Sequence, residues 1–419
     1  MHQPVNTGLV LMGGGARAAY QAGVLQAVAQ LKREAGVRGS PFDIFVGTSA
    51  GAINSAALAC VNDRFELAVD VLGQLWAQLG VEHVYRADAL GVMRSGSRWM
   101  TMLSVGWAMR KWRRTMPRSL LDNSPLREFL QDHIHLGRLP RLIERGHLRA
   151  LAISGSSYTT GEHITFYQSR ERVAPWTRSQ RRAVPGPITL DHLVASSAIP
   201  FIFPAQPVAM ADGTEWLGDG SMRQSAPMSP AVHLGAERVF VIGAGRMQEA
   251  RQQTAQRRLD GAPGLAHIAG HAMSSIFLDA LSTDIERAQR INKTLALLTP
   301  EQRAGTPLRA IDVLVIAPSR RLDELAGEHQ HELPGPIRAL LGAVGVRGKG
   351  RAATGSALAS YLLFVPGYVN ALIELGAKDA LAQREAVRSF FGWDRQDQLP
   401  RTGSAPGGTD GSLTGRPSL

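Results

Sequence analysis

The chain has 419 residues, of which 44% are hydrophobic, so it is long enough to bury a large core in one domain or two. Its single cysteine, Cys60, excludes internal disulfides and suits a reducing compartment. The net charge is +11, and no apolar run reaches the roughly 18 residues that span a bilayer.

Thr7 to Met12 is a short apolar segment that predicts a buried strand, and apolar residues at helical spacing predict a helix from about Ala18 to Ala35. Between these elements lies the run Gly13, Gly14, Gly15, Ala16 and Arg17. Glycines and a helix start let backbone N–H groups approach an anion closely. A dinucleotide-binding loop is excluded because Ala18 replaces its third glycine, and the Gly-Lys-Ser/Thr of a Walker loop is absent. The run therefore predicts an oxyanion hole for acyl transfer.

Phe42 to Val46 predicts a second buried strand, and Ala50 to Cys60 predicts a second helix. A G-x-S-x-G pattern spans their junction, with the residues Gly47, Thr48, Ser49, Ala50 and Gly51. This setting is typical of a nucleophile elbow, which presents its serine at a helix N-terminus. The alternative is a chance match in a chain with 44 glycines. Two consecutive strand–loop–helix units place their loops at the same end of a parallel sheet, so we expect Ser49 beside the glycine run.

These two motifs together resemble those of the patatin-like phospholipase family. Further along, Leu217-Gly218-Asp219-Gly220-Ser221 is similar to the family's aspartate motif, although Ser221 stands where glycine or alanine is usual. The segments Ala195–Pro200 and Phe203–Pro204 also resemble the family's approach to this aspartate. Ala18 departs from the glycine that usually follows the arginine. The resemblance covers most of residues 5 to 395.

The resemblance implies an α/β fold, a three-layer sandwich with a mostly parallel central sheet, in one acyl hydrolase domain at residues 1–395. It implies a catalytic dyad of Ser49 and Asp219, with Gly220 completing the aspartate motif. Asp219 would accept the Ser49 hydroxyl proton, and Ser49 would attack a phospholipid or related ester to form an acyl-enzyme. The expected oxyanion donors are the backbone N–H groups of Gly14, Gly15 and Arg17. Two other classes stay open: a non-catalytic lipid-binding or regulatory protein, and a soluble thioesterase or small-ester hydrolase.

The segment from Tyr85 to Ser119 combines basic, tryptophan and methionine residues. It holds eight arginines and lysines against one acidic residue, Asp88, and its apolar centre is flanked by cations on both sides. This pattern predicts an interfacial helix that contacts an anionic membrane, although a core hairpin with a solvated basic edge fits it equally. A nucleic-acid partner is not expected, because no binding motif accompanies the basic residues. No signal peptide opens the chain, so we expect a cytoplasmic protein, peripheral on the inner membrane face.

The remaining elements follow from local patterns. The sequence predicts helices at 123–132, 189–198, 265–292, 361–375 and 378–391, and strands at 148–154, 164–167, 238–244 and 311–317. Residues 168–187 are polar and arginine-rich and are predicted to form a loop. The tail at 400–419 is rich in Gly, Ser, Thr and Pro and is predicted to be disordered.

Other candidate residues have weaker motifs around them. The twelve histidines form no H-E-x-x-H and no Cys/His cluster, so we expect neither zinc nor another cofactor. A Ser-His-Asp triad would have to use His163, His192 or His233, each of which is predicted to be structural or exposed. Asp212 is expected in a turn, and Arg17 either braces the oxyanion loop or lies on the surface. The sequence does not indicate an oligomeric state.

Overall fold

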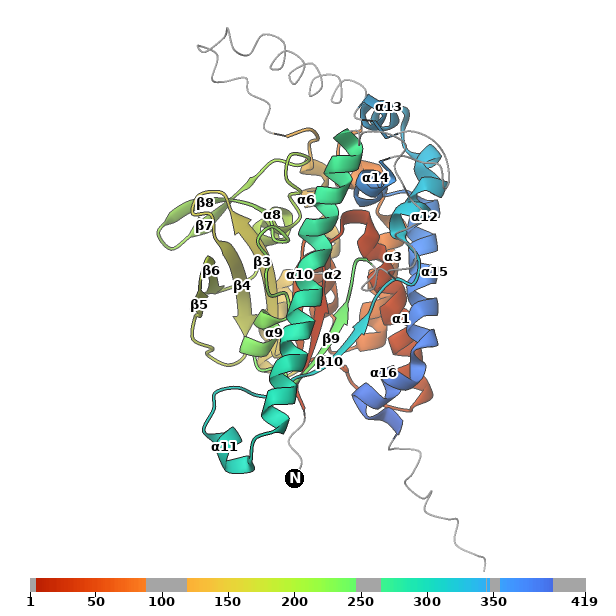
Figure 1. Ribbon diagram of the computed structural model, residues 1–419. Helices are drawn as coiled ribbons and strands as arrows, with labels where there is room; N and C mark the ends of the chain where they lie inside the picture. Colours follow the sequence, from red (N-terminus) through yellow and green to blue (C-terminus); the bar gives the residue numbers. More distant parts are fainter. Residues whose placement is uncertain (1–4, 88–118, 246–264, 344, 347–354, 395–419) are drawn as a thin grey trace, which may run out of the picture.

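The computed structural model describes residues 5–87, 119–245, 265–343, 345–346 and 355–394 (Figure 1). Nearly all of the basic Tyr85–Ser119 segment and the whole tail at 400–419 lie outside these residues, so the predictions for them stay predictions.

One large mixed sheet forms the centre of the molecule. Its strand order is β10-β9-β1-β2-β3-β4-β6-β5, with β8 pairing the end of β3 and β7 pairing β8. The five strands from β10 to β3 are parallel, and β4 and β8 run antiparallel to β3. The strand bounds are β1 Thr7–Leu11, β2 Ile44–Thr48, β3 Ala150–Ser157, β4 His163–Ser169, β5 Thr177–Arg178, β6 Arg181–Pro185, β7 Gln206–Met210, β8 Gly213–Asp219, β9 Arg238–Ile242 and β10 Asp312–Ile316.

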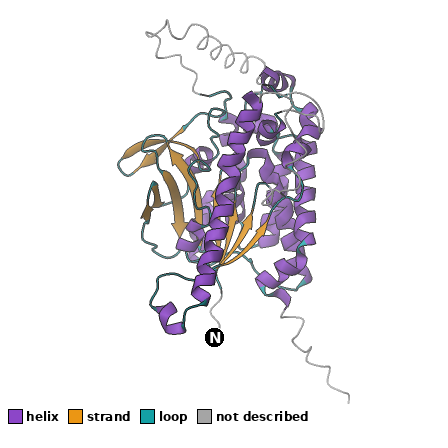
Figure 2. Cartoon of the chain, viewed as in Figure 1, coloured by secondary structure: helices purple, strands orange, loops and turns teal. Residues whose placement is uncertain are grey.

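Helices cover both faces of this sheet, which makes three layers (Figure 2). The major helices are α1 Ala19–Glu34, α2 Ala50–Ala59, α3 Phe65–Gln78, α6 Ser124–His133, α8 Leu190–Ser196, α9 Ser229–His233, α10 Leu265–Ala296, α12 Leu322–His329, α13 Gly335–Ala343, α14 Ser356–Leu362, α15 Pro366–Ala382 and α16 Arg384–Phe391. Shorter elements are η1 Gly15–Ala18, α4 Val81–Val84, η3 Leu136–Arg138, α7 Leu139–Glu144, α11 Pro300–Ala304 and η5 Gln330–Glu332. The predicted three-layer α/β fold with a mostly parallel sheet is confirmed.

The alternation of side chains along β1 shows how the layers are held. Leu9 and Leu11 pack into the core beneath α1, α2 and α15, whereas Val10 points to the opposite core beneath α9 and α10. All three side chains are at most 1% exposed, as expected for a central parallel strand. The central parallel strands therefore carry continuous apolar runs, which is why the sequence located these strands well.

Glycine allows α1 and α15 to pack closely. A Cβ at Gly23 would collide with the carbonyl of Ile373, and one at Gly376 would collide with the carbonyl of Tyr20. The sequence pattern predicts a helix break near Gly376, but α15 continues to Ala382. One break lies before Pro366, whose ring disfavours helical backbone at Val365, and the other lies at Gln383, between α15 and α16.

The polar 168–187 segment differs from its prediction as a loop. It contains β5 and β6, which extend the sheet edge beyond β4. Arginines and a proline in this region masked the strand pattern, and such residues are common on edge strands. Among the described residues, no single helix is long and apolar enough to cross a membrane. The pair α14 and α15, bent by 93°, meets the length and composition test only when taken together.

Candidate active site

The G-x-S-x-G motif forms a sharp turn between β2 and α2. Ser49 has φ 56° and ψ −131°, a backbone conformation that a residue with a Cβ rarely adopts. A Cβ at Gly47 would collide with the Gly51 carbonyl, and one at Gly51 would collide with the Leu11 carbonyl. The turn therefore requires both glycines, and it holds Ser49 at the carboxyl edge of the parallel strands as the sequence predicted.

Asp219 is the last residue of β8, and the pairing of β8 with β3 places it beside Ser49. Antiparallel pairing sets Asp219 opposite Gly155 of β3. The Ser49 hydroxyl donates a hydrogen bond to Asp219 Oδ2 at 2.6 Å, and the Ser221 N–H donates to Oδ1 at 2.8 Å. A Cβ at Gly220 would collide with the Ser154 carbonyl, which explains the glycine after the aspartate. Both carboxylate oxygens thus have partners, one of which is the serine hydroxyl.

Burial makes Asp219 more basic than an ordinary aspartate. The side chain is 0% exposed, and this desolvation raises its pKa to about 6, against the lowering effect of the hydrogen bonds from Ser49 and Ser221. Asp219 therefore titrates close to neutral pH, where a general base works best.

Ser196 hydrogen-bonds the backbone of the Gly47–Gly51 turn, a contact that the sequence did not predict. Its hydroxyl accepts a hydrogen bond from the Ser49 N–H at 2.9 Å and donates one to the Ser154 carbonyl at 2.6 Å. The side chain is completely buried at the end of α8. Its position in the Ala-Ser-Ser-Ala run before the aspartate motif was the available signal, but that run gave no hint of a partner.

The glycine run lies directly against this pair. A Cβ at Gly13 would stand 2.9 Å from Ser49 Cβ and 2.5 Å from Ser221 Oγ, so glycine is required there. Gly15 has φ 54° and is the first residue of η1, and both Gly15 and Ala16 are buried. Gly14 packs beside Ala244. The fold therefore brings the predicted oxyanion loop and the predicted nucleophile together.

The structure decides between the two interpretations of the Arg17 side chain and removes the Arg17 N–H from the expected oxyanion donors. Its N–H donates to the Gly14 carbonyl at 3.1 Å within η1, so this N–H is occupied and the expected oxyanion donors narrow to Gly14 and Gly15. Its side chain is 4% exposed, which excludes the surface interpretation. The guanidinium donates to Ser360 Oγ at 2.8 Å and lies 4.1 Å from the Tyr361 ring centroid, so it ties the loop to α14.

An apolar pocket opens beside Ser49. Ser49, Gly15 and Ser197 contribute to its wall, and all the other lining residues are apolar: Ala50, Ile53, Trp76, Leu79, Val84, Leu126, Ile199, Phe203 and Phe364. Trp76 is held in place by a hydrogen bond from its indole N–H to Asn54 Oδ1 at 2.9 Å. The pocket therefore has a rigid apolar wall with the serine at its edge.

The three candidate histidines, His163, His192 and His233, pack among other side chains, and no described histidine hydrogen-bonds Ser49 or Asp219. Burial on β4 lowers the pKa of His163 to about 4, and His192 packs its ring 4.1 Å from that of Phe166. His233 stacks on Trp176. Asp212 lies in the turn between β7 and β8, as predicted. The described residues contain no group of three or more His, Cys, Asp or Glu arranged for a metal ion.

The chain is distantly similar to several solved structures. They include VipD from Legionella pneumophila, at 13% identity over 91% of this chain and 67% of that chain, with a TM-score of 0.34. Human GIVD cytosolic phospholipase A2 has 13% identity over 93% and 63%, with a TM-score of 0.39. ExoU in its heterodimeric complex with SpcU from Pseudomonas aeruginosa has 16% identity over 71% and 56%, with a TM-score of 0.23.

The chain thus spans between 56% and 67% of the length of these three solved chains. No curated protein matched its sequence. Residues 9–232, more than half of the 419, match the family model described as Patatin-like phospholipase. The chain therefore belongs to the patatin-like phospholipase family.

Proposed function

We propose that this protein is a phospholipase A-type lipid acyl hydrolase that uses Ser49 and Asp219 as a catalytic dyad. Membership of the family supports lipid ester hydrolysis. The observation that carries the finer proposal is the 2.6 Å hydrogen bond from Ser49 Oγ to the buried Asp219 carboxylate. This geometry is that of a nucleophile and its base.

In the proposed reaction, Asp219 accepts the hydroxyl proton as Ser49 Oγ attacks the ester carbonyl. The N–H groups of Gly14 and Gly15 stabilise the negative charge on the carbonyl oxygen. The tetrahedral intermediate then collapses, and the protonated Asp219 gives its proton to the leaving alcohol. Water attacks the acyl-enzyme in the second half, with Asp219 again as base, and releases the fatty acid and free Ser49.

The apolar pocket suits the acyl chain of the substrate. Ser49 stands at its edge, and its wall offers aliphatic and aromatic side chains to a hydrocarbon. The cavity measures only about 30 Å³, so it holds a short length of hydrocarbon next to the ester, and each methylene group buried there contributes about 0.8 kcal/mol. The apolar wall therefore favours an acyl group with methylene groups beside the ester over an acetyl group.

The segment that contributes Ile199 and Phe203 to the pocket also carries an exposed aromatic side chain that fits contact with a lipid surface. Phe201 is 81% exposed and has φ 66°, and it lies between Ile199 and Phe203, which line the pocket. Its carbonyl accepts a hydrogen bond from the Leu120 N–H at 2.9 Å, which fixes the segment. We therefore propose peripheral membrane contact on this side, where Leu120 directly follows the basic Tyr85–Ser119 segment in the chain.

Turnover of defined substrates by the wild type and Ser49→Ala tests the proposal. We expect release of fatty acid from phospholipid, faster than from a short-chain thioester, and none from the variant. Ser55→Ala is a matched control, because Ser55 is a buried serine on α2 whose hydroxyl has no hydrogen-bond partner among the described residues. Wild-type protein that binds lipid vesicles without turnover would favour the non-catalytic class, and a preference for thioesters would favour the thioesterase class.

A further inference from the structure

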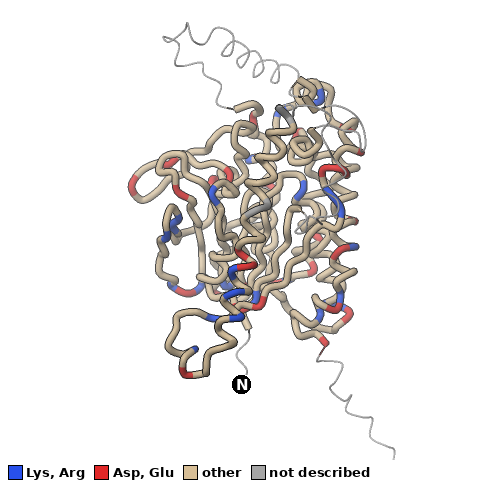
Figure 3. Tube along the Cα trace, viewed as in Figure 1, with Lys and Arg blue, Asp and Glu red and all other residues tan. Residues whose placement is uncertain are grey.

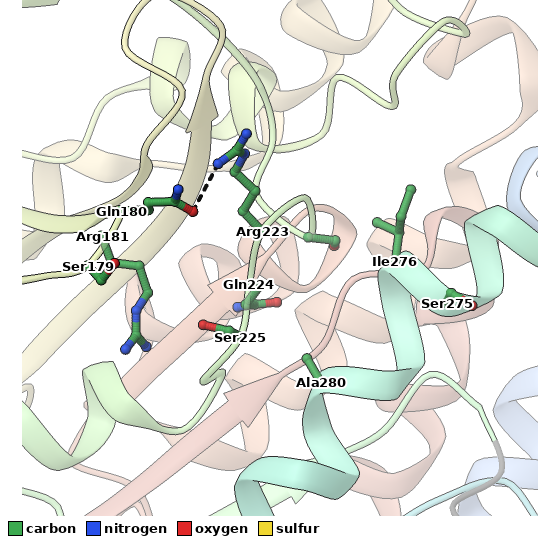
Figure 4. A pocket seen from close by; sticks show the side chains of 10 residues that line it. Ser179, Gln180, Arg181, Arg223, Gln224, Ser225, Ser275, Ile276 and Ala280 are labelled. Atoms are coloured by element: carbon green, nitrogen blue, oxygen red, sulfur yellow. Dashed lines mark hydrogen bonds between the residues drawn. The ribbon is translucent and has the colours of Figure 1, made fainter.

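A second pocket, of about 330 Å³, adjoins the dyad and shares no lining residue with the apolar pocket. Figure 4 shows its walls: Gln180 and Arg181 at the β5–β6 edge, Arg223 to Ser225 on the loop after Asp219, and Ser275, Ile276 and Ala280 on α10. Nothing in the proposed acyl-transfer step uses these side chains.

Hydrogen bonds connect this pocket directly to the dyad. Ser221 belongs to its wall, and the Ser221 N–H donates to Asp219 Oδ1 at 2.8 Å. Gln224, also in the wall, donates to Thr48 Oγ1 at 2.6 Å, one residue before the nucleophile. An ester bound at Ser49 therefore has both an apolar pocket and a polar pocket beside it, which matches the two halves of an amphiphile.

The polar pocket carries positive charge. Its ten described lining residues include Arg181 and Arg223 and no acidic residue. Figure 3 marks basic residues at the adjoining β5–β6 edge. The neighbouring Arg182 is neutralised by ion pairs with Glu162 and Glu215, whereas neither lining arginine forms an ion pair with a described carboxylate.

Asp284 is the described acidic residue on whose pKa the charge of Arg181 acts, and its carboxylate already has other partners. Burial raises the pKa of Asp284, against the lowering effect of a backbone hydrogen bond and of Arg287 and Arg181. This carboxyl accepts the hydrogen bond from the Met228 N–H at 2.9 Å and lies 3.9 Å from Arg287. The positive charge of the pocket wall is therefore available to a ligand.

The backbone conformation also fixes the position of Arg223, one of the two arginines in the pocket wall. Gln180 and Arg223 have φ 56° and 59°, a left-handed conformation that is unfavourable for residues with a Cβ. Their side chains meet in a hydrogen bond from Arg223 Nη1 to Gln180 Oε1 at 3.1 Å, drawn as a dashed line in Figure 4. Strained residues of this kind often hold a functional group in position.

We propose that this pocket binds the phosphate of a phospholipid headgroup, with Arg223 as its main ligand and Arg181 adding positive charge from the β6 side. The guanidinium fork suits phosphate oxygens, and a phosphate is the anionic group that stands a few bonds from the ester in such a lipid. The inference rests on the proposed lipid hydrolysis and names the polar half of its substrate.

Calorimetric titration of the full chain with sn-glycero-3-phosphate tests the binding directly. This probe has no acyl ester, so the result does not depend on catalysis. We expect Arg223→Gln to weaken binding about tenfold or more, since a hydrogen bond to a charged group is lost. Arg223→Lys keeps the charge and should retain more binding than Arg223→Gln at the same backbone position.

Arg178→Gln is the matched control, because Arg178 lies on the same hairpin but outside the pocket wall. Thermal denaturation of each variant reports whether it is folded. Equal binding by wild type and folded Arg223→Gln overturns the proposal, as does absence of binding to the wild type. Inorganic phosphate separates the two sources of the anion: tighter binding of glycerophosphate supports a headgroup site, and equal binding overturns it in favour of a free-phosphate site.

Turnover provides a second, separate readout. The ratio of kcat/KM for a soluble short-chain phosphatidylglycerol to that for a triacylglycerol of the same acyl length should fall about tenfold in Arg223→Gln and stay constant in Arg178→Gln. An unchanged ratio overturns the headgroup assignment while leaving ester hydrolysis intact. If the wild type hydrolyses neither phosphatidylglycerol nor triacylglycerol, that result counts against the proposed ester hydrolysis, while the calorimetric titration still tests the phosphate site.

Discussion

Asp219→Asn should inactivate the enzyme and at the same time stabilise its fold. The amide cannot accept the Ser49 hydroxyl proton, so reaction of Ser49 with a fluorophosphonate probe should be lost along with ester hydrolysis. The shape of the side chain is kept. A buried carboxylate that the folded protein tolerates only at an energetic cost is replaced by a neutral group.

The magnitude follows from the pKa of Asp219. A value of about 6 in place of 3.8 means that the folded protein disfavours the charged form by about 3 kcal/mol relative to the unfolded chain. The amide cannot accept from both Ser49 and Ser221 and loses about 1–2 kcal/mol for one hydrogen bond. Above pH 6, the variant should therefore be more stable than the wild type by about 1–2 kcal/mol.

The pH dependence of this difference is the sharper test. Between pH 3.8 and about 6 the unfolded chain has released the Asp219 proton while the folded protein still holds it, so wild-type stability falls as pH rises through this window. The amide of the Asp219→Asn variant does not titrate. Denaturant unfolding of both proteins at pH 4, 5, 6, 7 and 8 should show the difference growing by about 3 kcal/mol from pH 4 and levelling above pH 6.

The wild-type rate should follow the same ionisation. We expect kcat/KM on a soluble ester to rise with pH through about 6 and then to level. A stability difference that is constant with pH would refute the argument that burial raises the pKa of Asp219. Undiminished fluorophosphonate labelling of the variant would refute the dyad itself, since it would show that another base activates Ser49.

Three further predictions concern the loop, the acyl pocket and the basic segment. Gly15→Val should lower turnover about 10²–10³-fold by displacing an oxyanion donor, and because its Cβ would collide with the Tyr361 carbonyl, thermal denaturation should also show a lower Tm; near-normal turnover would place the oxyanion hole elsewhere. Ile53→Phe should fill the apolar pocket and shift the preference in an acyl-length series toward shorter chains, whereas an unchanged profile would remove this pocket from the substrate site. Binding to anionic vesicles, measured by co-sedimentation at low and high salt, should weaken by about 1 kcal/mol for each neutralised cation among Arg110, Lys111, Arg113 and Arg114; equal binding would favour the core hairpin.

The sequence predicted the N-terminal half of the site because its signals are local. Each strand, glycine turn and helix follows directly in the chain, and the predicted strands at 7–12 and 42–46 lie within two residues of β1 and β2 at each end. Hydrophobic runs locate buried parallel strands, and the short turns leave few ways to connect them. The meeting of Gly13 with Ser49 followed from this topology alone.

The C-terminal half of the site depends on distant pairing, which a local pattern does not reveal. The strand β8 was not predicted, because its partner for Asp219 is Gly155, far back in the chain, and the short hairpin with β7 includes a proline and exposed positions. Arg17 is buried only because Ser360 and Tyr361 come from the last helices of the domain. The family resemblance supplied both Asp219 and its pairing with Ser49, whereas no local pattern in the sequence indicated the strand that brings the two side chains within 2.6 Å.

The two residues of the proposed dyad are both in conformations or environments that lower the stability of the fold. Ser49 has φ 56° and ψ −131°, a sparsely populated backbone conformation that costs about 1–3 kcal/mol for a residue with a Cβ, and Asp219 is held in a completely buried position. Neither feature helps the fold, since glycine at the first position and asparagine at the second would each relieve part of the cost. A fold selected only to bind lipid in the apolar pocket would have no reason to keep both, together with a hydrogen bond of 2.6 Å between them. The strained serine, the buried carboxylate and the hydrogen bond between them together favour catalysis, and the stability gain of Asp219→Asn measures the free-energy cost of burying that carboxylate.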